Sequence, residues 1–145
     1  RLIARRDRIR VPLWILAIAG TQVAGAAAYP GLYPDAADRQ VQADIMGSNP
    51  AMRAMTGPGH GLEDYTFGAM MTNEYLGFMV IFAALMSVFL VVRHTRAEEE
   101  EGRAELVRAN VAGSAAALSA SLTAAVIANV VLALLIAAGM ASLGI

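Results

Sequence analysis

Cysteine and lysine are both missing from this chain of 145 residues, and charged residues make up only 16% of it. Without cysteine there are no disulfides, no thiolate metal ligands and no thiol nucleophile. Without lysine there is no Schiff-base chemistry and no phosphate-binding loop that ends in Gly-Lys-Ser or Gly-Lys-Thr. No paired catalytic groups are visible either. The sequence therefore predicts no catalytic residue and no cofactor in this chain.

One group of possible metal ligands, His60, Glu63 and Asp64, follows the turn sequence Gly57-Pro58-Gly59. A turn that leads into a capped helix explains this spacing more simply, because no second histidine lies nearby in the sequence. We predict no metal site.

Apolar residues are abundant and clustered. They make up 57% of the chain, and the mean hydropathy is +0.54. Three runs approach or exceed the ~20 residues that cross a ~30 Å hydrocarbon core, and the first is followed by Tyr29-Pro30-Gly31 rather than a cleavage site. The sequence predicts an all-α integral membrane chain with helices over 11–28, 71–92 and 111–145. The third run is longer than the core, so we expect a break or a protruding end, and we expect the chain to be part of a longer protein.

The charges between these runs predict the topology. Five arginines lie in residues 1–10, which could form a short amphipathic helix at the headgroups, and they indicate a cytoplasmic N-terminus. Segment 29–70 carries more acids than arginines and is predicted to lie outside. It should contain two short helices, one after Asp35 with its apolar face on the membrane and one that begins at Asn49-Pro50.

The cytoplasmic segment 93–110 has the clearest charge pattern. Arg96 with Glu100, and Glu99 with Arg103, are spaced as partners on a helix. We expect a short helix that docks on another protein, whereas the alternative is a solvated connector without a partner.

Polar residues are rare in the predicted spans. Asn129 would need a partner inside a helix bundle, and small residues on the same helix would allow close packing. Glu74, at the outer edge of the second span, is expected at the membrane interface. A possible substrate pathway comprises Thr21, Gln22, Met79, Met86 and Asn129, although interhelical hydrogen bonds or gap filling would also explain these residues.

The run from Arg93 to Ala109 resembles the first cytoplasmic loop of actinobacterial ABC-2 type exporter permeases, the group for antibiotic, polyketide and multidrug export. The flanks also agree, with Arg5-Arg6-Asp7-Arg8 through Trp14, Tyr29-Pro30-Gly31-Leu32-Tyr33-Pro34, and Asn49-Pro50 through Gly57-Pro58. The resemblance covers almost the whole chain. It implies a plasma-membrane permease of about a dozen spans, of which this chain would be the N-terminal three-helix portion, or first quarter.

The resemblance also implies a mechanism. An elbow helix over 1–10 precedes the first span, and a coupling helix at about 97–108 sits on a separate ATP-binding subunit, expected as a homodimer, that binds ATP and Mg²⁺. The implied coupling residues are Arg96, Glu98, Glu99, Glu100, Glu101, Arg103, Glu105, Leu106 and Arg108. The implied function is ATP-driven export of hydrophobic or amphipathic compounds. The alternative is a secondary transporter or a membrane scaffold that does not transport, although no span carries the acid or histidine that is expected in a proton-coupled pump.

Overall fold

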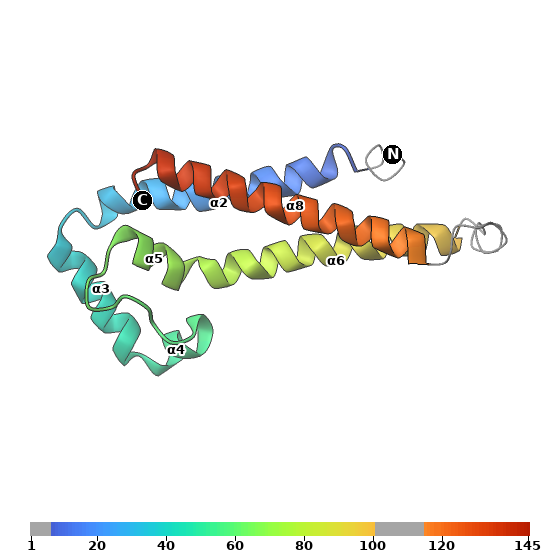
Figure 1. The fold of residues 1–145 in the computed structure, drawn as a ribbon. Helices are drawn as coiled ribbons and strands as arrows, with labels where there is room; N and C mark the ends of the chain where they lie inside the picture. The colour runs from blue at the N-terminus through green and yellow to red at the C-terminus, as the bar shows by residue number, and fades with distance from the viewer. Residues whose placement is uncertain (1–6, 101–114) are drawn as a thin grey trace. The chain divides into compact units, whose positions relative to one another are not determined.

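The computed structural model describes residues 7–100 and 115–145, and the regular elements in these residues are all α-helices (Figure 1). Side chains are described for residues 7–94 and 118–145. The helices are α2 (Arg10–Leu32), α3 (Ala36–Ser48), α4 (Pro50–Thr56), α5 (Phe67–Glu74), α6 (Leu76–Glu100) and α8 (Ala115–Ser142). Most of the predicted elbow helix and the C-terminal part of the predicted coupling helix lie outside the described residues.

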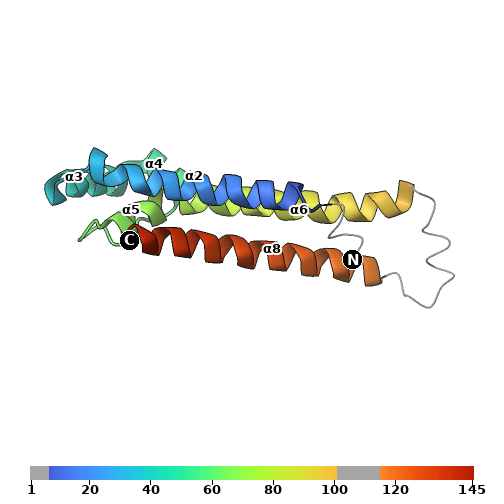
Figure 2. The same cartoon turned by 90° about the horizontal axis from the view of Figure 1, so that it is seen from above.

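The prediction of three helices that are long and apolar enough to cross a membrane is confirmed within the described residues. The stretches long and apolar enough to span are Arg10–Leu32, Leu76–His94 and Leu118–Ser142. α2 includes Pro30 and ends two residues later, at Leu32. The helix tolerates this proline because, so close to the end, it disturbs few backbone hydrogen bonds. α8 runs for 28 residues without a break (Figure 2), which is about 42 Å at ~1.5 Å per residue. It is therefore longer than a ~30 Å hydrocarbon core, as expected for a helix with a protruding end.

The second apolar run is divided at Tyr75. The sequence indicates one span from residue 71, whereas the structure has the short helix α5 before α6. Backbone bonds from Tyr75 to Met71 and from Met79 to Tyr75 bridge the interruption. Thr66 caps α5 with its hydroxyl, which accepts from the Ala69 N–H, and this cap explains why a helix begins at Phe67.

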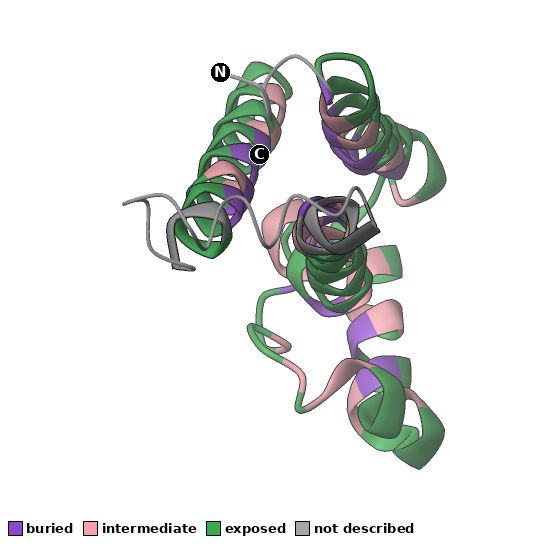
Figure 3. Cartoon of the chain, turned by 90° about the vertical axis from the view of Figure 1, so that its right-hand side faces the viewer, coloured by how far each residue is buried: buried purple, intermediate pink, exposed green. Residues whose placement is uncertain are grey.

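The chain forms two compact units, and each long helix contributes a segment to both. The first unit comprises the described residues of Arg1–Ile18 and Phe82–Leu135. In it α8 buries a stripe of Ser121, Ala125, Ala128 and Leu132. Small residues at a helix contact let backbones approach closely, which is how packing energy arises where the solvent is itself apolar. The remaining faces of the long helices are largely exposed (Figure 3), as expected for surfaces that meet lipid or further helices.

The second unit comprises Ala19–Ile81 and Ile136–Ile145. Its core is built from the end of α2, from α3 and from α5, and its buried members are Ala26, Tyr29, Ala43, Tyr65, Met70 and Met71. Polar side chains hold the loop between α4 and α5. Gln40 donates to the Leu62 carbonyl (2.7 Å), Arg39 donates to the Tyr65 carbonyl (3.1 Å), and Asn73 binds both the backbone N–H and the carbonyl of His60.

The predicted start of α4 is present, since the Asn49 side chain accepts from the N–H groups of Ala51 and Met52 and Pro50 occupies the first turn. Gly57 follows the helix with a φ of +83°, a conformation that favours glycine. The sequence predicts that the apolar face of α3 with Val41 and Ile45 lies on the membrane, and the structure buries another face of this helix. Ala43 and Met46 pack inward, whereas Val41 and Ile45 are exposed. Tertiary contacts from the loop side select the buried face here.

Candidate functional site

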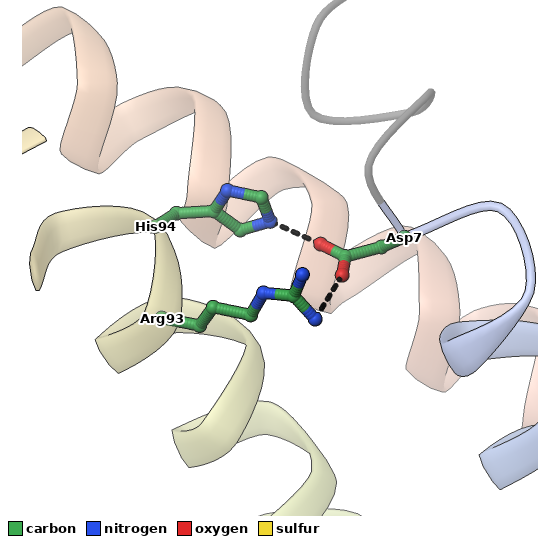
Figure 4. A network of polar contacts seen from close by, with 3 residues as sticks. All are labelled: Asp7, Arg93 and His94. Atoms are coloured by element: carbon green, nitrogen blue, oxygen red, sulfur yellow. Dashed lines mark hydrogen bonds and ion pairs between the residues drawn. The ribbon is translucent and has the colours of Figure 1, made fainter. Parts of the chain in front are cut away.

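A buried acid lies just before the first long helix, within the first unit (Figure 4). Asp7 lies three residues before α2, and a turn at residues 8–9 connects it to the helix. Its carbonyl accepts a hydrogen bond from the Val11 N–H (3.1 Å). Its carboxylate meets two side chains from α6. Arg93 Nη1 lies 3.1 Å from Asp7 Oδ1, and His94 Nε2 donates to Asp7 Oδ2. We call Asp7, Arg93 and His94 the Asp7 cluster.

Burial makes this contact important. The Asp7 and His94 side chains are 6% and 8% exposed, and the Arg93 side chain is 29% exposed. An isolated carboxylate removed from water is strongly unfavourable, so Asp7 depends on its two partners, while the guanidinium keeps contact with solvent. The cluster therefore fixes the segment before α2 against α6, directly ahead of the charged run that follows Arg93.

Two cavities adjoin the Asp7 cluster in the first unit. One, of about 340 Å³, lies between the start of α2 and α6 and includes Trp14, Met86, Phe89 and Arg93. The other, of about 470 Å³, lies against α8 and is walled by Ile15, Ile127 and Val131 among others, with Asp7 and Arg8 in its lining. Both have apolar walls and charged residues in the lining, so both suit amphipathic molecules or the apolar faces of further helices.

The role of Asp7 is not evident from the sequence, because arginines dominate residues 1–10. The available signal was that Asp7 is the sole acid in that segment. Its partners lie 87 residues further along the chain, and a single sequence does not reveal that proximity.

The predicted pathway residues fall in both units. Met86 is buried in the first unit, where Asn129 donates to the hydroxyl of the neighbouring Ser87. In the second unit Gln22 and Met79 are buried and Thr21 is exposed. The Gln22 side-chain oxygen has no hydrogen-bond partner among the described residues. A shared pathway for these five residues remains a prediction.

The expectation that Asn129 has an interhelical partner is confirmed. Its Nδ2 donates to Ser87 Oγ on α6 (2.8 Å) and to the Ala125 carbonyl within α8 (2.8 Å). Membrane hydrogen bonds of this kind couple helices by ~0.6 kcal/mol on average. A double-mutant cycle of Asn129→Ala with Ser87→Ala in the full-length protein should give a coupling of this size in the free energy of unfolding. Thr123→Ala, whose hydroxyl bonds inside α8, should show no coupling to Ser87.

The predicted coupling residues are described only in part. Arg96, Glu98, Glu99 and Glu100 belong to α6, which continues without interruption from the second span. Glu101, Arg103, Glu105, Leu106 and Arg108 lie outside the described residues. In the other loop, His60 contributes its backbone to Asn73, and no group of three potential metal ligands occurs in residues 7–94 and 118–145.

Comparison with known proteins gives the family. Residues 2–145 match the family described as the C-terminal domain of the multidrug efflux system permease Rv1217c. The chain is also 36% identical over 120 residues to the multidrug efflux system permease protein Rv1217c of Mycobacterium tuberculosis. This alignment covers 82% of the present chain and 21% of that protein. No solved structure matches. The resemblance implied a first quarter of such a permease, whereas the family is described as a C-terminal domain, so the position in the longer protein remains a prediction.

The chain thus spans about a fifth of the relative. The three apolar helices and the match over nearly all residues lead to the same conclusion: the chain belongs to the multidrug efflux permease family of Rv1217c.

Proposed function

We propose that this chain is part of the permease of an ATP-driven exporter in the plasma membrane, which moves hydrophobic or amphipathic compounds such as antibiotics out of the cell. The family match supports the permease role. The observation that carries the mechanism is the Asp7 cluster, because it links the start of α2 to α6 just before the predicted coupling helix.

The proposed transmission begins at the loop after the second span. Two copies of an ATP-binding subunit hold ATP and Mg²⁺, and their ATP-driven closure moves the helix around 97–108. Residues 97–100 continue α6, so a displacement there passes into the helix that carries Arg93 and His94. The contact of Asp7 with these two residues then moves the start of α2 together with α6. The packed helices would thus move as rigid bodies between inward-open and outward-open arrangements.

The test is copurification of the full-length permease with the ATP-binding subunit encoded beside it, in lipid nanodiscs. The double variant Glu99→Arg/Glu100→Arg should lose drug-stimulated ATPase activity by at least about tenfold, because a like-charge contact costs several kcal/mol. Glu63→Arg is the matched control, since Glu63 is an exposed acid in the predicted outer loop, and it should leave the activity unchanged.

Two results would contradict the proposal. One is normal ATPase stimulation in the double variant. The other is that no ATP-binding subunit copurifies, which would favour a secondary transporter or a scaffold.

A further inference from the structure

Glu74, the last residue of α5, is a partly buried carboxylate. Its Oε2 accepts a hydrogen bond from the Tyr29 hydroxyl of α2. Its Oε1 is buried and has no hydrogen-bond partner in the described part of the chain. Among the side chains of residues 7–94 and 118–145, none forms an ion pair with it. A desolvated carboxylate in this condition is unfavourable unless a positive group approaches it.

Aromatic rings pack against Tyr29, the residue that donates to this carboxylate. All four tyrosines of the sequence, Tyr29, Tyr33, Tyr65 and Tyr75, belong to the core of the second unit or pack against it. The Tyr29 ring stacks on Tyr33, with a centroid distance of 5.8 Å, and meets Tyr75 edge-on at 6.0 Å. We call Glu74 and the four tyrosines the Glu74 cluster.

Tyr65 adds a second unsatisfied group. It is 2% exposed, and its hydroxyl has no hydrogen-bond partner among the described residues. Burial raises the pKa of the Tyr65 phenol, and the negative charge of Glu74 raises it further. The phenol stays neutral, and like any phenol it has no cationic form that could pair with Glu74.

Gly25 of α2 leaves space for the Tyr75 ring. A Cβ atom at Gly25 would lie 2.9 Å from Tyr75 Cε1 and 3.0 Å from its hydroxyl, closer than packed carbon atoms normally approach. Glycine at this position leaves room for the Tyr75 ring beside Tyr29. The close approach of the rings thus depends on a residue without a side chain.

A small cavity of about 60 Å³ also lies at Glu74. Its walls include Met55, Phe78 and Ile81, and Glu74 is the sole charged residue in its lining. The polar groups of Thr56 and Asn73 are already engaged, with the Met52 carbonyl and with His60 respectively. The volume corresponds to about two water molecules, since a water occupies ~30 Å³ in the liquid. A space of this size suits the head of an alkylammonium ion.

The chemistry selects among ligands. An anion would be repelled by Glu74, and a metal ion would need further ligands that residues 7–94 and 118–145 do not group there. An organic ammonium ion fits the carboxylate and the Phe78 ring that line this cavity, because it pairs with a carboxylate and is attracted to aromatic rings. We propose that the cavity at Glu74 binds the ammonium group of an amphipathic amine. That such amines are exported rests on the proposed function above, whereas their binding does not.

The test uses the full-length permease in phosphatidylcholine nanodiscs without the ATP-binding subunit. The probes are n-octylammonium and the neutral n-octanol, which has the same chain length. Octylammonium should bind saturably and raise the thermal unfolding temperature, whereas octanol should not. Glu74→Gln should weaken octylammonium binding by at least about tenfold, as expected when one partner of a buried charge contact is neutralised. Glu63→Gln, an exposed acid of the same unit, should bind like the wild type.

Tyr29→Phe keeps the ring and removes the hydroxyl that binds Glu74, so it should also weaken binding and serves if Glu74→Gln does not fold. Equal binding of octanol and octylammonium, or wild-type affinity in both variants, would overturn the proposal. So would the absence of any octylammonium binding, which would mean that a cationic side chain elsewhere in the permease already occupies the site. None of these results depends on copurification with an ATP-binding subunit, so the two proposals fail separately.

Discussion

Asp7→Ala is expected to destabilise the full-length permease by about 3 kcal/mol, near the low end of the range for removing one partner of a buried ion pair. The loss is large because His94 is left buried without its acceptor. It stays near the low end because Arg93 keeps contact with water. The measurement is the free energy of unfolding in detergent or nanodiscs. Asp38→Ala, an exposed acid on α3, is the control and should change stability little.

A double-mutant cycle separates this contact from a general effect of Asp7. In a background of Arg93→Ala and His94→Ala, the further change Asp7→Ala should cost much less, because the donors are already gone. An equal cost in both backgrounds would show that Asp7 stabilises the protein through something other than these two side chains.

Gly139→Ala is expected to lower stability by about 1–3 kcal/mol, the usual cost of overpacking a tight contact. An added Cβ at Gly139 on α8 would collide with the Val23 side chain of α2, in the second unit. Gly139→Leu should be more severe. The measurement is again the free energy of unfolding, together with the yield of folded protein in the membrane.

Two variants test the cause. Val23→Ala should recover most of the stability lost in Gly139→Ala, because it removes the atoms that the new methyl group meets. Gly20→Ala is the matched glycine control, since a Cβ there meets nothing within 4 Å, and it should be neutral. Failure of Val23→Ala to rescue would mean that the contact at Gly139 is not the critical one.

Features that depend on local composition could be predicted from the sequence. Long apolar runs gave the three spanning helices, and Asn49-Pro50 gave the start of α4, because an Asn cap followed by proline is a signal within a few residues. The need of Asn129 for a partner also follows from its polarity alone, although the identity of Ser87 does not. Family membership was predicted from the charged run after the second span and its flanks.

Features that depend on distant partners could not be predicted in this way. Asp7 meets α6 across 87 residues, and Glu74 meets Tyr29 across 45. Asn73 binds the backbone of His60, which has no side-chain signature at all. The sequence did not indicate that Ala43 and Met46 of α3 pack inward, because helical periodicity alone does not name the distant residues that a face meets. A single sequence carries no information on these proximities.

The Asp7 cluster also bears on how the protein is made. Translation releases Asp7 long before Arg93 and His94, and at ~5–20 residues per second a separation of 87 residues corresponds to a delay on the order of ten seconds. During that interval the carboxylate stays hydrated at the start of the nascent first helix, because Arg93 and His94 do not yet exist. Paired burial of Asp7 can therefore occur only after α6 has been synthesised as far as His94. The first helix is committed to the bundle late in biogenesis, when the second helix has been completed.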